Sequence, residues 1–313
     1  MSLLNILTTI VPIFAVIVLG HLLRRGGIPN AEFWNLNDRL VYWVLMPALL
    51  FTQCSTAEIS ADLVGSYAIV ILGGFLTALA FGIVSARLAG MGVGATGAVM
   101  QCSARHNIFI SLSVAGSIFG AEGLALASLG AAILIPVTNL CVVPLLIWLH
   151  RHGSEDGIAW AMVRDLCRNP LIIAVVLGAG WNATGIGEVP VLHQTTGIIG
   201  AAALPVVLMC IGANLRVRSM QTAFGPLALS VIGKFLVFPT VTVGLALWLG
   251  MSRQETLVAL LFAAAPVATA AYTQAKQMGG DAPLTAALTT IQTAMALVTL
   301  PLWILAVEAL FRP

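Results

Sequence analysis

The sequence contains very little charge. Only 8% of its 313 residues are Asp, Glu, Lys or Arg, whereas 59% are hydrophobic. A soluble domain carries about 25% charged residues, so this chain lacks the polar surface that a water-soluble protein needs. The net charge of +2 is also too small to indicate a nucleic-acid partner. Composition therefore excludes an ordinary soluble domain and predicts a protein whose solvent is the lipid bilayer.

The sequence also lacks the short motifs of catalysis, ATP hydrolysis and metal binding. It contains no H-E-x-x-H, no G-x-S-x-G and no G-x-x-x-x-G-K-[ST]. Its five cysteines are scattered and form no C-x-x-C pair, so neither a disulfide framework nor a zinc site is expected. We therefore expect neither an intramembrane enzyme nor an ATP-driven pump, and no resident cofactor or metal.

Continuous apolar sequence is abundant instead. Runs of about twenty apolar residues have the length of membrane-crossing helices, whereas barrel strands alternate apolar and polar residues over about ten positions. Ten segments can be marked: Leu4–Leu23, Leu40–Cys54, Leu63–Ala86, Ala95–Phe119, Leu124–Leu149, Pro170–Thr184, Val191–Ala213, Phe224–Leu249, Thr256–Gln274 and Leu284–Leu310. The sequence thus predicts an all-α integral membrane protein with about ten transmembrane helices.

A polar stretch at the midpoint, residues 151–169, separates five segments from five. Because five is odd, two such halves in series insert with opposite topology. Weak internal similarity agrees with a repeat. The matching pairs are Met46-Pro47 with Leu204-Pro205, Val143-Pro144 with Leu300-Pro301, and Gly120-Ala121-Glu122 with Gly279-Gly280-Asp281. We predict an inverted repeat with a first five-helix half at 1–150, a cytoplasmic linker at 151–169 and a second half at 170–313.

Basic residues predict the orientation of the chain. The loops after segments one, three, five, seven and nine hold ten of the fourteen lysines and arginines: Arg24, Arg25, Arg39, Arg87, Arg151, Arg164, Arg168, Arg216, Arg218 and Lys276. The opposite side holds Arg253 and Arg312. Since cytoplasmic loops are enriched in Lys and Arg, both termini are expected outside the cytoplasm.

The fourth segment carries an unusual polar cluster around Arg105, His106 and Asn107. An arginine at the centre of a spanning helix costs about 2.5–3.5 kcal/mol on insertion scales. Arg105 lies ten residues after Ala95, or about 15 Å at the helical rise. Two interpretations stay open: Arg105 reaches a headgroup or a neighbouring carbonyl, or it faces a ligand.

The ninth segment contains a helix breaker, Pro266. An offset of 159 between the halves pairs Pro266 with Asn107, so the break of one half is expected to face the polar cluster of the other. Helices interrupted at the midplane direct their N-termini, with free N–H groups and partial positive charge, toward a shared site that suits a carboxylate. The alternative is an ordinary proline kink.

The remaining buried polar groups favour an anionic ligand. Lys234 lies near the middle of the eighth segment and either neutralises a ligand or snorkels to the surface. No Asp or Glu lies in the middle third of any segment, and Glu308 is near the outer end of the tenth. Asn214 ends the seventh segment and is either a ligand contact or a helix cap. His106 either carries a proton, since the reference pKa of histidine is about 6.5, or simply donates a hydrogen bond.

These motifs resemble those of the auxin efflux carrier family, which includes bacterial malonate-type permeases and the plant PIN-type carriers. The resemblance rests on Arg105-x-Asn107 followed by Phe109-Ile110, on Ala265-Pro266-x-Ala268, and on Gly279-Gly280-Asp281. It covers essentially the whole chain. The sequence departs from the family where a second proline or glycine often stands, because His106-Asn107-Ile108 occupy that place, which leaves open how sharply helix four is broken.

The resemblance implies a fold similar to that of bile acid symporters, in which helices four and nine are interrupted and cross. Helices one, two, six and seven would form a scaffold, and helices 3–5 and 8–10 a transport domain that moves like an elevator. It also implies a small carboxylate substrate and a homodimer through the scaffold helices. We expect the bacterial inner membrane as the location, and the driving force is either coupling to H+, coupling to Na+ or the anion's own gradient. An anion channel or a membrane sensor is the alternative. The expected substrate-binding residues are Arg105, His106, Asn107, Ala265, Pro266, Thr269, Lys234 and Asn214.

Overall fold

In the computed structural model, described for residues 2–57, 61–150, 164, 167–216 and 224–311, the chain forms helices and short connections without a strand in those ranges. In chain order the helices are α1 (Leu3–Arg25), α2 (Ala31–Leu40), the π-helical turn η1 (Val41–Leu45), α3 (Met46–Thr56), α4 (Ala61–Leu88), α5 (Val93–Ala104), α6 (Ile108–His150), α8 (Pro170–Ala183), α9 (Pro190–Ala201), α10 (Ala203–Asn214), α11 (Phe224–Ile232), the π-helical turn η3 (Gly233–Val237), α12 (Phe238–Trp248), α13 (Arg253–Ala264), α14 (Ala270–Gln277) and α15 (Ala282–Leu310). The prediction of an all-α membrane protein is confirmed.

Six helical stretches of the described chain are long and apolar enough to cross a bilayer. They are Leu3–Arg25, Leu63–Leu88, Val93–Leu149, Pro190–Asn214, Phe224–Trp248 and Ala282–Leu310, with a shorter apolar helix at Pro170–Ala183. The stretch Val93–Leu149 is far longer than the roughly twenty residues of one crossing. It turns back at Gly120, whose φ of +63° is a conformation that side chains with a Cβ rarely adopt. Most of the predicted linker, 151–163 and 165–166, lies outside the described residues.

Polar caps fix where several helices begin. Ser252 and Glu255 form a reciprocal capping box at the start of α13, and the Asp281 carboxylate accepts the N–H of Leu284 (2.9 Å) at the start of α15. Such caps satisfy N–H groups that have no partner within the helix. The Gly-Gly-Asp motif therefore has a local structural role, because it ends one helix and starts the next.

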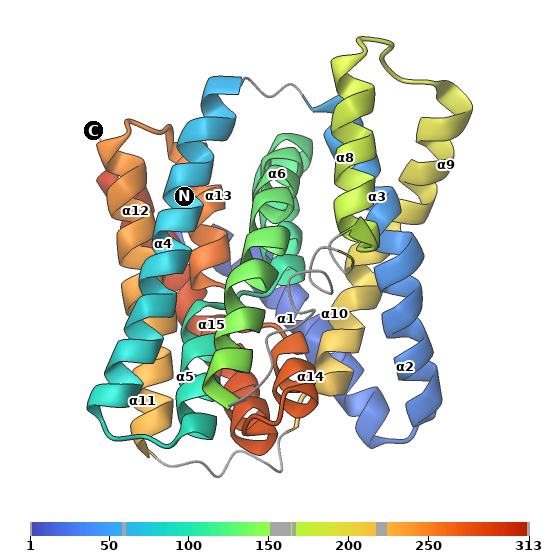
Figure 1. Ribbon diagram of the computed structural model, residues 1–313. Helices are drawn as coiled ribbons and strands as arrows, with labels where there is room; N and C mark the ends of the chain where they lie inside the picture. The colour runs from blue at the N-terminus through green and yellow to red at the C-terminus, as the bar shows by residue number, and fades with distance from the viewer. Residues whose placement is uncertain (1, 58–60, 151–163, 165–166, 217–223, 312–313) are drawn as a thin grey trace.

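The helices pack in two groups on either side of α6 (Figure 1). On one side α1 packs along α10, and α3 packs along α8 and α9. The Asn182 amide of α8 reinforces this group by donating to the carbonyls of Ser55 (3.1 Å) and Ala57 (2.9 Å). On the other side α4 packs on α5 and α12, and α13 packs on α6, α12 and α15. The short α14 lies low and near the centre of Figure 1, beside α15.

Candidate functional site

The two interrupted helices meet at their breaks. Residues 105–107 separate α5 from α6, and residues 265–269 separate α13 from α14. The backbone N–H of Asn107 donates to the carbonyl of Pro266 at 2.8 Å. The two positions that the internal offset pairs are therefore in direct contact, and helix four is fully broken despite having no proline there.

Each break is followed by a new helix: Asn107, before α6, is buried, whereas at the start of α14 Thr269 is half-buried and Ala270 is exposed. Asn107 caps α6, since its Oδ1 accepts the N–H groups of Phe109 (3.2 Å) and Ile110 (3.3 Å). Thr269 precedes α14 and makes no side-chain cap hydrogen bond to its first turn. The start of α6 therefore has a side-chain cap, whereas at the start of α14 the N–H groups of Ala271 and Tyr272 donate to the backbone carbonyls of Ala268 and Thr269.

A buried glutamine of α15, which the sequence analysis missed, ties the two breaks together. Gln292 is fully buried. Its Nε2 donates to the carbonyl of Cys102 (2.9 Å) near the end of α5, and its Oε1 accepts the N–H of Val267 (3.2 Å) in the second break. The signal was present in the sequence, because a glutamine in the middle of a membrane segment is expensive unless it has partners.

Replacement of Gln292 by methionine, which has a similar shape, is expected to destabilise the protein. The change leaves the Cys102 carbonyl and the Val267 N–H without this partner in a buried place, and each such group costs about 1–3 kcal/mol. We expect the Tm in detergent to fall by roughly 4 °C or more. The exposed Gln194→Met is the matched control and should leave Tm unchanged. Equal melting of the two variants would show that Gln292 is not a structural tie.

Arg105 joins the first break to α14 instead of reaching toward a headgroup. Its side chain is buried, and its guanidinium donates to Oε1 of Gln274. The Gln274 amide in turn donates to Asn139 of α6 (3.4 Å). Arg105 therefore adds a fixed positive charge beside α14.

His106 and Lys234 lie together on the α12 side of the first break. The His106 ring stands edge-on to the rings of Phe75, Phe238 and Phe262, at centroid distances of 6.4, 6.4 and 5.8 Å. Lys234 is completely buried, with its ammonium 4.6 Å from the centre of the Phe238 ring and without a hydrogen-bond partner among the described residues. The snorkelling interpretation of Lys234 is therefore wrong, because the fold closes around its long stem.

An inner cavity of about 410 Å³ lies next to the crossing. Its walls come from α1, α2, η1 and α10 on one side and from α6, α14 and α15 on the other: Arg24, Asn35, Asp38, Val41, Tyr42, Val207, Asn214, Arg216, Phe109, Thr269, Ala270, Tyr272, Thr273, Ala286, Thr289 and Thr290. Two of the eight predicted site residues, Thr269 and Asn214, line it. The other six, Arg105, His106, Asn107, Ala265, Pro266 and Lys234, are buried and are not among its lining residues.

The inner cavity combines basic side chains with the uncapped start of α14. The Arg216 guanidinium lies 4.0 Å above the Tyr272 ring, and Nη1 of Arg24 is buried with no hydrogen-bond partner in the described part of the chain. The cavity also contains one carboxylate of opposite charge, Asp38, whose Oδ2 accepts a hydrogen bond from the Asn214 amide at 2.8 Å. Asn214 therefore bonds to α2 instead of capping its own helix. Two cations, one carboxylate and a helix N-terminus favour a small anionic ligand.

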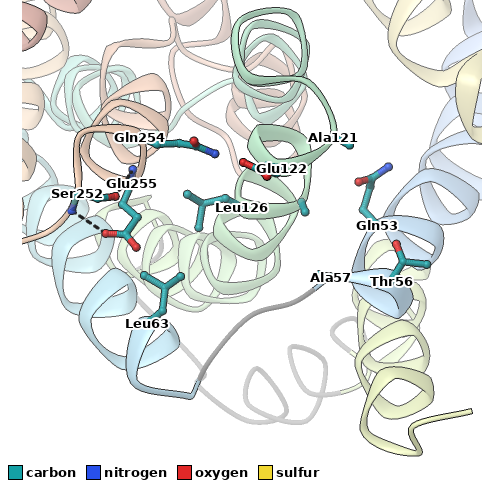
Figure 2. Close-up of a pocket in the computed structure, with 11 residues that line it drawn as sticks. Gln53, Thr56, Ala57, Leu63, Ala121, Glu122, Leu126, Ser252, Gln254 and Glu255 are labelled. Carbon is teal, nitrogen blue, oxygen red and sulfur yellow. Dashed lines mark hydrogen bonds between the residues drawn. The ribbon is translucent and has the colours of Figure 1, made fainter. Parts of the chain in front are cut away.

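An outer cavity of about 550 Å³ lies near the other end of the continuous helical run 31–56 (Figure 2). Gln53 and Thr56 of α3 face it from one side, while Glu122 of α6 and Gln254 and Glu255 of α13 face it from the other. The two cavities thus lie toward opposite ends of the run 31–56: the inner cavity lies between α2 and the group that contains α6, and the outer cavity between α3 and that group.

Comparison with known proteins agrees with these features. The family model described as "Membrane transport protein" matches residues 5–304. An uncharacterized transporter of Methanothermobacter thermautotrophicus is 26% identical over 299 residues, which cover 94% of this chain and 96% of that protein. The match thus spans both helix breaks and both cavities.

Proposed function

Because the chain belongs to the membrane transport protein family of auxin efflux carriers, we propose that it is a secondary transporter of a small organic anion, a malonate-like mono- or dicarboxylate. The observation that carries this proposal is the inner cavity, in which Arg24, Arg216 and the uncapped N-terminus of α14 converge. Ionisable side chains within a membrane protein are costly to bury, so buried or half-buried cations usually mark a functional site.

In this proposal the carboxylate binds at Thr269 and Ala270, which line the inner cavity at the N-terminus of α14. The guanidinium of Arg216 pairs with the same carboxylate, and Arg24 provides a donor for a second one. Arg105 does not line the cavity and would attract the carboxylate only through its charge. Its partner Gln274 lies five residues along α14 from Thr269, about 8 Å at the helical rise. The hydrogen bond between Asn107 and Pro266 would keep the two helix breaks together. His106 and Lys234, which are buried beside the first break, would not contact the anion directly.

We propose that the carrier works by alternating access as an elevator. The scaffold would consist of α1, α2–α3, α8 and α9–α10, which pack on one another. The moving group would consist of α4, α5–α6 and α11–α15, forming with the scaffold a five-plus-five inverted repeat. The presence of an inner and an outer cavity along the same boundary supports this division. By the distribution of basic residues, the inner cavity faces the cytoplasm of a bacterial cell, and both termini lie outside. In this proposal the scaffold helices would also form the interface of a homodimer.

Counterflow of labelled malonate in proteoliposomes tests the proposal. A carrier saturates with malonate and speeds up when unlabelled malonate is present on the far side, whereas an anion channel or a sensor does neither. Arg216→Gln removes the cation nearest the proposed carboxylate, and we expect the Kd for malonate to rise at least tenfold, because a charge-assisted hydrogen bond is worth about 1.5–3 kcal/mol. Arg39→Gln, which removes the same charge from an exposed position outside the cavity, should bind malonate normally.

Absence of binding for mono- and dicarboxylates alike, in wild-type protein with a sharp thermal transition, would refute the anion-carrier proposal. Equal Kd values for Arg216→Gln and Arg39→Gln would refute the site while leaving the function standing. A ligand that binds the folded state raises its melting midpoint by mass action, so thermal shift with and without sodium provides a rapid first screen.

A further inference from the structure

Asp38 is an acid in a cavity otherwise suited to anions. It lies in α2, outside the apolar spans of the described chain, and among the lining residues of the inner cavity it is the one carboxylate. A sphere of the cavity's volume would be about 9 Å across, close to the ~8 Å Debye length at physiological ionic strength. Ionised Asp38 therefore repels an anion bound anywhere in the cavity.

The groups around Asp38 do not fully neutralise it. The Asn214 amide donates to it, the Cys210 thiol of α10 lies within hydrogen-bonding reach, and Arg24 of α1 contributes an attractive charge. Burial nevertheless dominates and raises the pKa of the Asp38 carboxyl above its ordinary value, while the two hydrogen bonds and Arg24 offset this only in part. Across the cavity the other titratable or charged lining groups are Arg216, Tyr42 and Tyr272, none of which is a carboxylate.

We propose that Asp38 is a proton-binding site that makes anion binding in the inner cavity proton-linked, an inference that rests on the proposed function. When an anion enters, one proton from the adjoining solution joins a carboxylate oxygen of Asp38, and the neutral acid no longer repels the guest. Linkage makes the effect reciprocal: the anion favours protonation, and protonation favours the anion. Binding on this side is therefore tighter at lower pH.

The position of Asp38 determines whether its proton crosses the membrane together with the anion. Asp38 lies on the wall built by α1, α2 and α10, whereas the proposed carboxylate site is on α14. If α14 moves and the scaffold stays, the proton remains on the inner side. Asp38 thus regulates the loading and release of the anion in response to pH on that side, and its proton is not carried with the substrate.

The test compares malonate binding by wild type and Asp38→Asn from pH 5 to pH 8. Because malonate itself titrates, the readout is the ratio of the two Kd values at each pH. As the pH falls and the wild-type carboxyl becomes protonated, the ratio should approach one. At pH 8 the variant should bind about tenfold more tightly, because its neutral amide imitates the protonated acid. Isothermal titration in buffers of different ionisation enthalpy should detect proton uptake in wild type that is lost in the variant.

His21 of α1 is the matched control, since it lies one turn before Arg24 but is not among the residues that line the inner cavity. His21→Gln should keep both the proton uptake and the pH dependence. Should Asp38→Asn fail to fold, Asp38→Ser keeps an acceptor for the Asn214 amide without a charge. A ratio that stays constant across the pH range, or proton uptake that persists without Asp38, would overturn this inference. Failure of wild type to bind malonate at any pH would instead overturn the proposed function.

Discussion

Replacement of Gly212 by alanine is expected to abolish or severely weaken folding. Gly212 lies where α10 crosses α1, and a Cβ built there would lie 1.7 Å from the carbonyl oxygen of Ile17. The contact is mutual, because a Cβ at Gly20 of α1 would lie 2.0 Å from the carbonyl oxygen of Met209. Both obstacles are backbone atoms of rigid helices, so the helices themselves must separate.

Overpacking of a well-packed interior typically costs about 1–3 kcal/mol and sometimes more. We expect the upper end here, which corresponds to a fall in Tm of roughly 6 °C or more, or to aggregated protein on size-exclusion chromatography. Gly244→Ala in α12 is the matched control, since a Cβ there meets nothing within 4 Å and alanine favours a helix over glycine. A Gly212→Ala protein that melts like Gly244→Ala would contradict the close crossing of α1 and α10.

Replacement of Arg105 by methionine is expected to reduce malonate binding and transport about thirtyfold while leaving the protein folded. With the axial rise of about 8 Å between Thr269 and Gln274 taken as the separation, a unit charge interacts with the bound carboxylate by about 2 kcal/mol at an effective dielectric constant of 20. Folding should persist because methionine fills much of the same space. The Gln274 amide that loses its partner lines an open cavity and has access to water.

The charge and the geometry of Arg105 are separable. Arg105→Lys keeps the charge without the planar fork, so it should bind malonate within about tenfold of wild type if electrostatics dominates. Arg87→Met is the control for loss of one positive charge, because Arg87 stacks on Trp148 near the end of α4 (4.5 Å) and should transport normally. Normal counterflow by Arg105→Met would show that the buried arginine is structural only.

Several features of the site were predictable because their causes are local. A proline in an apolar run breaks a helix wherever the helix goes, so Pro266 marked one break directly. The polar cluster at Arg105 and Asn107 marked the other, since polar groups in a membrane segment require partners. The offset between the halves then paired Asn107 with Pro266, which form a hydrogen bond.

Other features were not predictable because they depend on which way a side chain points after packing. Asp38 and Arg24 precede or end apolar segments and look like ordinary loop charges, yet α1, α2 and α10 bring them into one cavity. Arg105 is central in the sequence, but the fold places it against Gln274, 169 positions away.

The sequence by itself determined that this chain is an all-helical membrane protein, where its helices break and to which family it belongs. Hydropathy, proline and buried charge act on the scale of one or two helical turns, so each can be recognised in a single segment. Only the tertiary structure decided which polar residues face the inner cavity, that Lys234 is sealed from solvent and that Gln292 joins the two breaks. Those outcomes depend on contacts between helices far apart in the chain, whose rotation and crossing are set by close packing at positions such as Gly212.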